Sequence, residues 1–138
     1  QADCRLTLTE VADKVGLSVS PCHRRIKRME ENGVVLRYAA VVDPRAVGLP
    51  VSVFVSIKLE RQKEADLERF AKAIASWQEV VECYLMTGQR DYLLRVVVAD
   101  LVAYEQFIKH KLTRLDGISS IESSFALDQV KFAVSLPL

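Results

Sequence analysis

The sequence has no apolar run near the roughly 18 residues that a membrane-spanning helix needs, although half of its 138 residues are hydrophobic. Its first residues do not resemble a signal peptide. The three cysteines, Cys4, Cys22 and Cys83, are odd in number and widely spaced, which argues against a disulfide framework and fits a reducing compartment. We therefore expect a cytoplasmic protein with an apolar core and no membrane span.

Recognisable sets of catalytic or metal-binding residues are also missing. The two histidines, His23 and His110, fall in different predicted domains, and no Ser/His/Asp or Cys/His set is apparent. Adjacent side chains such as Cys22 and His23 diverge by about 100° on a helix, and no Cys-x-x-Cys spacing occurs. We expect no enzyme, no metal and no cofactor. A small ferredoxin-like enzyme and a thiol or metal sensor are the alternatives.

A strong overall charge is absent as well. Lys and Arg number 19 against 18 Asp and Glu, which gives a formal net charge of +1. The chain is not a polycation, so any binding to nucleic acid must use a local basic patch. Its length of 138 residues leaves room for one domain or two small ones.

The stretch from Thr9 to Glu31 has the pattern of a helix–turn–helix. Thr9 can cap a first helix, whose apolar residues recur at helical spacing: Val11, Ala12 and Val15. Gly16 can end that helix in a left-handed conformation, and Ser18 can cap a second helix that ends at Gly33. This order of cap, short helix, glycine turn, cap and longer helix predicts a DNA-binding motif.

The second helix divides into an apolar and a basic face. The apolar face, which must pack on its domain, contains Val19, Cys22, Ile26 and Met29. The opposite side is basic, since no acidic residue lies between Cys22 and Met29. Its basic side chains are suited to bind guanine edges and phosphates of DNA. The candidate DNA-binding residues on this helix are Ser18, Ser20, His23, Arg24, Arg25, Lys27 and Arg28. The alternative is a solvated basic face on an ordinary helix.

We assign two kinds of contact to double-stranded DNA within this set. The residues expected to face bases are Ser20, His23, Arg24 and Lys27. Arg25 and Arg28 flank them and are the phosphate candidates.

A linker follows the motif. Val34 to Val42 is rich in β-branched and aromatic residues and predicts an extended strand, before a turn that starts at Asp43. We place residues 1–33 in a DNA-binding domain, 34–50 in the linker and 51–138 in a second domain. The strand could pair with its copy in a second subunit, and a dimer would supply two recognition helices.

The second domain has the order strand, helix, strand, strand, helix, strand. The predicted strands and helices cover Val51 to Leu59, Leu67 to Trp77, Val80 to Met86, Tyr92 to Val98, Leu101 to Leu115 and Ile118 to Phe132. Two successive strand–helix–strand units predict an α+β fold, a ferredoxin-like βαββαβ sandwich. Its helix-free sheet face would contain Phe54, Tyr84, Val97 and Phe125. An exposed apolar sheet face usually marks association, so we expect a dimer that packs sheet against sheet.

These segments together resemble the Lrp/AsnC (leucine-responsive, or feast/famine) family of transcription regulators. The similarity covers nearly all of the chain and is carried by VGLSVSPCHRRIKRMEENGVV, YAAVVDPRAVG, MTGQRDYLLRVVVADLVAYEQF and SSFALDQVK. The resemblance implies homodimers that assemble into tetramers or octamers, and small effectors, often amino acids. Because the family pattern starts with a further helix, we expect that this leading helix is missing from the chain as given.

The resemblance also implies an effector site close to one turn. The candidate effector-binding residues are Thr87, Gly88, Gln89, Arg90, Asp91 and Tyr92, with Asp100 in addition. Gly88 allows close approach of the backbone, its N–H groups can bind a carboxylate, and Asp91 or Asp100 could pair with an amino group. The alternative is an ordinary hairpin turn, with Asp100 as a helix cap.

The sequence therefore predicts a DNA-binding transcription regulator that responds to a small effector, which we expect to be an amino acid. An amino-acid-binding oligomeric module without DNA binding is the alternative from a different class.

Overall fold

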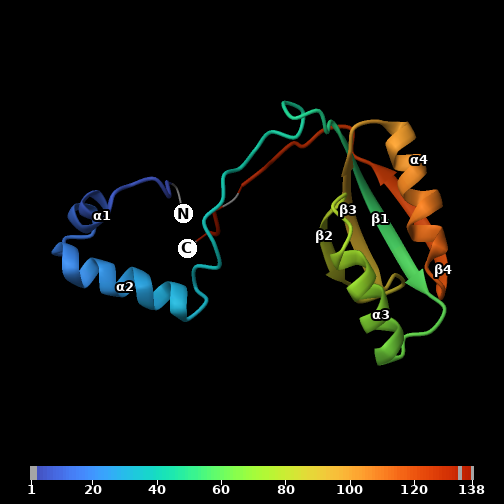
Figure 1. Cartoon of the computed structure of the whole chain (residues 1–138), viewed down its shortest axis with the longest axis horizontal. Helices are drawn as coiled ribbons and strands as arrows, with labels where there is room; N and C mark the ends of the chain where they lie inside the picture. Colours follow the sequence, from blue (N-terminus) through green and yellow to red (C-terminus); the bar gives the residue numbers. More distant parts are fainter. Residues whose placement is uncertain (1–2, 134, 138) are drawn as a thin grey trace. The chain divides into compact units, whose positions relative to one another are not determined.

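A computed structural model describes residues 3–133 and 135–137 of the chain (Figure 1). The chain divides into two compact units. The first unit consists of Gln1–Val41 together with Val130–Leu138, and the second unit is Val42–Gln129. The boundary at residues 41 and 42 therefore falls inside the predicted linker 34–50. Residues 1, 2, 134 and 138 belong to the predicted domains 1–33 and 51–138 but lie outside the described residues.

The first unit contains the two predicted helices, α1 (Leu8–Lys14) and α2 (Val19–Glu31). The cap of α1 is Thr7 and not Thr9, which lies inside the helix, so that prediction was wrong. The Thr7 hydroxyl accepts from the Glu10 N–H at 3.3 Å, and the Glu10 carboxylate accepts from the Thr7 N–H at 2.6 Å. This reciprocal pair satisfies two N–H groups that the first turn of a helix leaves without partners.

The turns on either side of α2 depend on glycine. Gly16, between the helices, has φ +66°, and Gly33, after α2, has φ +69°. Beyond α2, the N–H groups of Gly33 and Val34 return to the carbonyls of Glu30 and Met29 at 3.0 and 2.8 Å. These are the two hydrogen bonds of a Schellman motif. Gly33 is thus confirmed as the predicted end of α2, and Ser18 occupies the predicted cap position, but its side chain makes no capping hydrogen bond.

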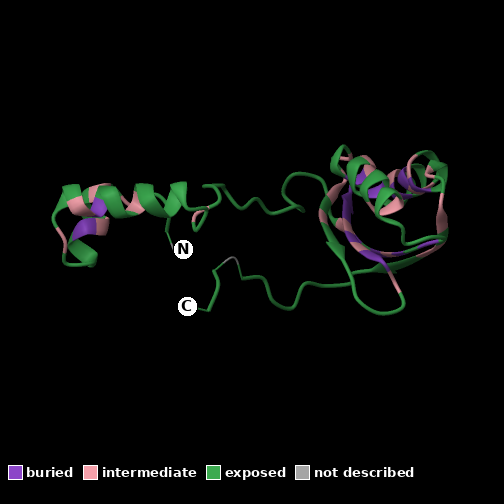
Figure 2. Ribbon diagram, turned by 90° about the horizontal axis from the view of Figure 1, so that it is seen from below, coloured by how far each residue is buried: buried purple, intermediate pink, exposed green. Residues whose placement is uncertain are grey.

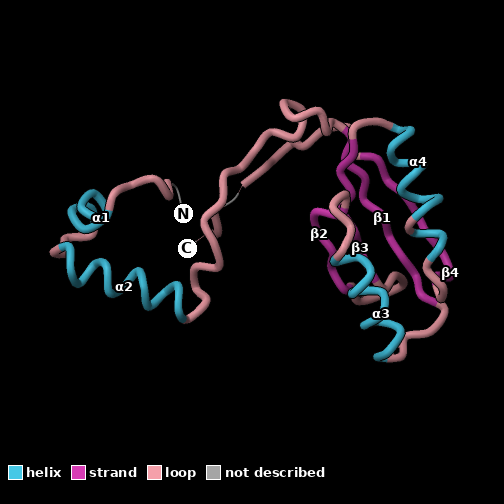
Figure 3. The backbone as a smooth tube through the Cα atoms, in the orientation of Figure 1, coloured by secondary structure: helices cyan, strands magenta, loops and turns pink. Residues whose placement is uncertain are grey.

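The second unit is the predicted α+β sandwich. Its elements are β1 (Val51–Leu59), α3 (Glu64–Ala75), β2 (Val80–Leu85), β3 (Tyr92–Val98), α4 (Leu101–His110), the short 3₁₀ helix η1 (Leu112–Arg114) and β4 (Ile118–Phe125). The strands form one four-stranded antiparallel sheet in the order β2-β3-β1-β4 (Figure 3). This is the order that two interleaved strand–helix–strand units produce, and the ferredoxin-like prediction is confirmed.

The core of this unit lies between the sheet and the two helices, which cover the same face (Figure 2). Alternate residues of the central strands supply it, and several are completely buried: Val53, Val55, Ile57, Leu94 and Val96. Leu112 of η1 is completely buried as well. Since β1 and β3 occupy the middle of the sheet, their alternation fixes which side every neighbouring residue faces.

We call the sheet side away from α3 and α4 the open face. The register places Phe54 of β1 beside Arg95 of β3, and Arg95 beside Glu82 of β2. The Arg95 guanidinium contacts the Glu82 carboxylate at 2.8 Å, and Tyr84 further along β2 is 52% exposed. A register shift between Val80 and Glu82 is what turns Glu82 toward this face.

Two predictions for the open face need correction. Val97 belongs to this face by register but is only 7% exposed, so it offers little apolar surface. Phe125 is on the opposite side, because its partner in β1 is the core residue Val53. Its ring lies edge-on to Tyr104 of α4, with a centroid distance of 5.2 Å. The apolar part of the open face is therefore smaller than the sequence pattern indicated.

Two predicted strands also differ from the structure. The last strand ends at Phe125 and does not continue to Phe132. Residues 34–42 join no sheet in the described part of the chain, although their apolar side chains are largely exposed. A β-branched and aromatic sequence forms a strand only where a neighbouring strand pairs with its N–H and C=O groups, and no strand of the described sheet pairs with this segment.

The capping box gives the first testable prediction. Thr7→Ala should lower the free energy of opening of α1 by about 1 kcal/mol, because it removes a side-chain cap. Thr9→Ala is the matched control and should change it by less than about 0.5 kcal/mol, since Thr9 is exposed inside the helix. Native-state amide hydrogen exchange of α1 measures both. Equal effects of the two substitutions would show that the assigned cap is wrong.

Candidate functional site

The helices α1 and α2 contact each other around a small buried centre. Ala12 and Cys22 are 1% and 3% exposed and are the buried apolar side chains of the described part of this unit. The N–H of Leu17, in the turn, donates to the carbonyl of Ala12 at 2.9 Å. Cys22, predicted to be a small core residue, is thus confirmed in that role.

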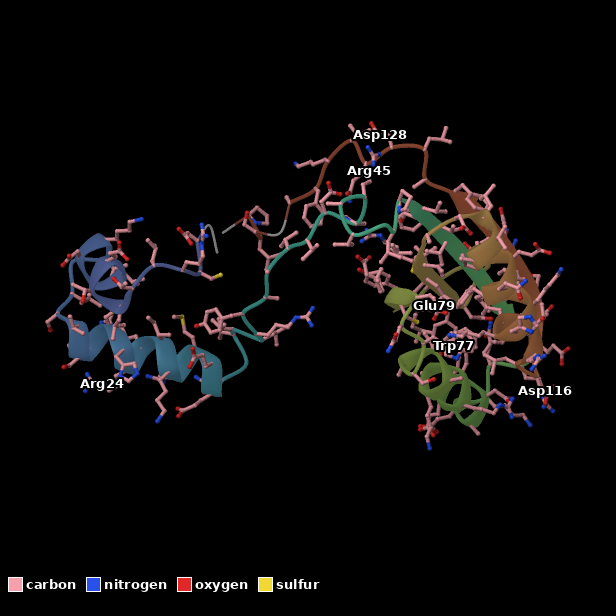
Figure 4. The ribbon with its side chains drawn as sticks, turned by 45° about the horizontal axis from the view of Figure 1, so that its top comes forward. Arg24, Arg45, Trp77, Glu79, Asp116 and Asp128 are labelled. Atoms are coloured by element: carbon pink, nitrogen blue, oxygen red, sulfur yellow. The ribbon has the colours of Figure 1, made fainter. Side chains whose placement is uncertain are left out.

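All the DNA-binding candidates are exposed, and they lie on α2 or at its start. Arg24 projects from α2 on the side away from α1 (Figure 4). Lys27 contacts Glu31 at 3.7 Å, whereas Arg24, Arg25 and Arg28 have no acidic partner among the described residues. These guanidinium groups are therefore available to an external anion.

Two side chains of the predicted apolar face of α2 are less covered than expected. Val19 is 42% exposed and Met29 is 39% exposed, although both share a helix face with buried Cys22. Ile26 is partly buried. The described contacts of this unit thus cover only part of the apolar surface that its sequence provides.

The turn between β2 and β3 contains the effector candidates. Thr87, Gly88 and Gln89 are exposed, and Gly88 has φ +106°, which favours glycine. The turn is closed by the Met86 N–H, which donates to the Asp91 carbonyl at 2.8 Å. No hydrogen bond within the described chain uses the N–H groups of residues 87–89. Free N–H groups that follow one another in a turn can bind a carboxylate.

Asp91 points inward from the end of this turn. It is 6% exposed, and one carboxylate oxygen accepts from the Leu59 N–H at 2.7 Å. The other accepts from the side-chain amide of Gln62 at 2.6 Å. Gln62 was not among the predicted site residues. It comes from the β1–α3 loop, far from Asp91 in sequence, and no motif or spacing links the two positions.

Arg90 points the other way, onto the open face. Its guanidinium contacts the Ser120 hydroxyl at 2.6 Å and the Glu122 carboxylate at 2.5 Å, both on β4. The adjacent side chains of Arg90 and Asp91 therefore contact different parts of the fold, β4 and the β1–α3 loop. The turn is thereby connected to the core loop on one side and to the open face on the other.

Two further candidates have structural roles in this chain. Tyr92 is a core residue whose ring stacks on Phe70 at 4.5 Å, and burial raises its pKa. Asp100 caps α4, where its carboxylate accepts from the Ala103 N–H at 2.7 Å. It lies beyond the opposite end of β3 from the turn, and the strand alone is about 20 Å long at the usual rise per residue. A small ligand at the turn does not reach Asp100 of the same chain.

The described residues include three free thiols and no cluster suited to a metal ion. No group of three or more His, Cys, Asp or Glu within residues 3–133 and 135–137 could hold a metal ion. All three cysteines are free thiols, and partial burial raises the pKa of the Cys83 thiol, which disfavours the reactive thiolate. Among the described helices, none is long and apolar enough to cross a membrane.

Comparison with protein families assigns both halves of the chain. Residues 1–35 match a family described as winged helix-turn-helix DNA-binding. Residues 52–136 match the Lrp/AsnC ligand binding domain.

Comparison with individual proteins agrees with the family matches. The DNA-binding transcriptional activator DecR of Escherichia coli K12 is 38% identical over the whole chain, which covers 91% of DecR. The Bkd operon transcriptional regulator of Pseudomonas aeruginosa is 43% identical, with 99% of this chain and 89% of that protein covered.

Solved structures extend the similarity to three dimensions. An AsnC family transcriptional regulator from Agrobacterium tumefaciens has a TM-score of 0.92 and 44% identity to this chain. The alignment covers 99% of this chain and 89% of the regulator. A Neisseria meningitidis transcriptional regulator in complex with L-methionine has a TM-score of 0.89 and 38% identity, with 96% and 86% covered. Together with the geometry of α2 and of the sandwich, these matches show that the chain belongs to the Lrp/AsnC family of transcriptional regulators.

Proposed function

We propose that this protein is a homo-oligomeric, sequence-specific DNA-binding regulator of transcription whose DNA affinity or assembly is shifted by an amino acid. The observation that carries the proposal is the free basic face of α2. Arg24, Arg25 and Arg28 are exposed and have no acidic partner within the described chain. Solvent-exposed cations without partners at one face of a recognition helix favour phosphate and base contacts.

The residues of this face have different expected roles. Ser20, Arg24 and Lys27 recur at helical spacing on one stripe and are the base-facing candidates, together with His23. Arg25 and Arg28 flank the stripe and would bind phosphates. Ser18 makes no side-chain capping hydrogen bond, so its hydroxyl is free to donate to a phosphate beside the first turn of α2.

Assembly would supply the second recognition helix that half-site binding needs. The open face combines exposed Phe54 and Tyr84 with the ion pair of Arg95 and Glu82, and the N–H groups of residues 36–42 make no hydrogen bond within the described chain. We propose that both are covered by a second copy in a homodimer, which then forms tetramers or octamers. The protein would act in the cytoplasm.

The effector proposal rests on the turn. The N–H groups of residues 87–89 are free to bind a carboxylate, and the buried carboxylate of Asp91 lies at the end of the same turn. Two structurally similar regulators, one from N. meningitidis and a feast or famine regulatory protein from M. tuberculosis, were solved in complex with L-methionine. An amino acid is therefore the class of effector that we propose, and L-methionine is the first to test.

Arg24→Ala tests the base contact. It should weaken binding to the cognate site by roughly 1–3 kcal/mol and relax specificity, because a bidentate guanidinium–guanine contact is lost. Arg24→Lys is the matched control, which keeps the charge but not the planar fork, and should retain affinity for random DNA. Fluorescence anisotropy on cognate and random duplexes measures both. Equal losses on the two duplexes would rule out a base contact by Arg24.

Arg28→Ala tests the phosphate contact. Binding should weaken on all sequences alike, and the slope of log affinity against log salt should fall by about one, because one fewer phosphate is neutralised. A salt titration of the same duplexes gives the slope. A slope identical to that of the unaltered protein would exclude the phosphate role of Arg28.

Gly88→Val tests the position of the effector site. A β-branched residue is strained at φ +106°, so the turn should deform and L-methionine binding, measured by titration calorimetry, should be lost. Gly48→Val is the matched control, since Gly48 also has positive φ, +78°, and open space around it but lies outside the turn. Intact binding by the Gly88 variant would mean that the effector site is elsewhere.

A further inference from the structure

We propose that Gln62 occupies the position at Asp91 that the ammonium group of the effector takes, and that its displacement transmits effector binding to the β1–α3 loop. Gln62 is then a positioning residue of the regulatory site. The proposal rests on the proposed function, since it presupposes an amino acid at the turn.

The first observation is the unusual set of partners of a buried carboxylate. Asp91 is 6% exposed, and its two described hydrogen-bond donors are the Leu59 N–H at 2.7 Å and the Gln62 amide at 2.6 Å. Both donors are neutral, and no cation pairs with Asp91 in the described chain. Buried carboxylates are usually paired with a charge or hydrogen-bonded by several donors. Asp91 therefore retains the capacity to bind a cationic group.

The second observation is that the two donors are held very differently. Leu59 ends β1, and the backbone next to it is fixed because the Asp91 N–H donates to the Ile57 carbonyl at 2.8 Å. Gln62 is exposed and lies in a loop whose neighbours, Arg61 and Lys63, are exposed as well. One carboxylate oxygen is thus fixed to the strand, whereas the other is bound by a side chain that can move away.

The chemistry of the exchange favours an ammonium group. A hydrogen bond between an ammonium and a carboxylate is about twice as strong as one from a neutral amide. The free N–H groups of residues 87–89 follow one another in the same turn that ends at Asp91 and can take the carboxylate of the ligand. The site therefore offers a complementary partner to each end of an amino acid, once Gln62 has moved.

Displacement of Gln62 has a structural consequence. The loop of residues 60–63 leads directly into α3, which begins at Glu64. The Gln62 amide contributes a side-chain hydrogen bond that holds this loop to the turn. An effector that takes over the Asp91 oxygen removes this contact, while the Glu60 N–H still donates to the Gly117 carbonyl at 2.8 Å. The two states thus differ in one defined contact, as any ligand-driven switch requires.

The test compares L-methionine binding by the full-length unaltered protein, Gln62→Ala and Gln62→Lys, measured by titration calorimetry. In the unaltered protein, only those molecules in which Gln62 has left Asp91 can bind the ammonium group, whereas every molecule of Gln62→Ala can. The affinity of the alanine variant for L-methionine should therefore rise by the inverse of that fraction, about tenfold if one molecule in ten is open. The lysine variant carries its own ammonium and should bind L-methionine at least tenfold more weakly. Gln78→Ala, the same change at an exposed glutamine in the α3–β2 turn, is the matched control and should bind like the unaltered protein.

A second ligand separates this mechanism from a general loosening of the loop. The deaminated analogue of L-methionine, 4-(methylsulfanyl)butanoate, has no ammonium group to take the place of Gln62. Its affinity should stay within about twofold in Gln62→Ala. An equal gain for both ligands would overturn the assigned role of Asp91, because the benefit would then not depend on the ammonium.

The remaining outcomes distinguish this inference from the proposed function. If the unaltered protein binds L-methionine and Gln62→Ala binds it with unchanged affinity, the displacement mechanism is wrong and the effector function stands. If neither protein binds L-methionine or any other of the twenty common amino acids, both the effector function and the displacement mechanism are wrong. Thermal unfolding of each variant, monitored by circular dichroism, checks that the sandwich remains folded.

Discussion

The antiparallel pairing of β1 with β3 is the constraint on which the rest of the second unit depends. The register from Val51 opposite Val98 to Ile57 opposite Tyr92 puts the apolar residues of both strands on the face that the helices cover. A shift by one residue would turn these side chains toward the open face and remove the core. Just before β3 begins, Arg90 contacts β4 and Asp91 contacts the β1–α3 loop, so the fold itself determines what the turn can contact.

The first unit depends more on local hydrogen bonds and glycine turns than on a buried core. Few of its described apolar side chains are buried, and its helices are defined mainly by local devices: the capping box at Thr7 and the glycines that follow α1 and α2. Such local devices fix the angle and length of α2 without using its polar face. Arg24, Arg25 and Arg28 consequently remain exposed and without an acidic partner in the described chain, as the proposed contacts with DNA require.

Local patterns made much of this architecture predictable. The strand Val51–Leu59 follows from period-two alternation and the end of α2 from the glycine at Gly33, and the Thr-x-x-Glu capping box at Thr7 was itself visible in the sequence. The hydrogen bond between Gln62 and Asp91 was not predictable, because it joins two loops through the fold. The side of Phe125 depends on its register with β1, and the direction of Glu82 depends on a register shift. Alternation within one strand reveals neither.

The central claim is that the free cations of α2 bind DNA and that an amino acid at the β2–β3 turn shifts this binding. The most direct measurement is fluorescence anisotropy of the full-length protein on its own upstream DNA, across a salt series, with and without L-methionine and the other common amino acids. The account predicts tight binding that weakens steeply with salt and that at least one amino acid shifts. Absence of binding at low salt would contradict it.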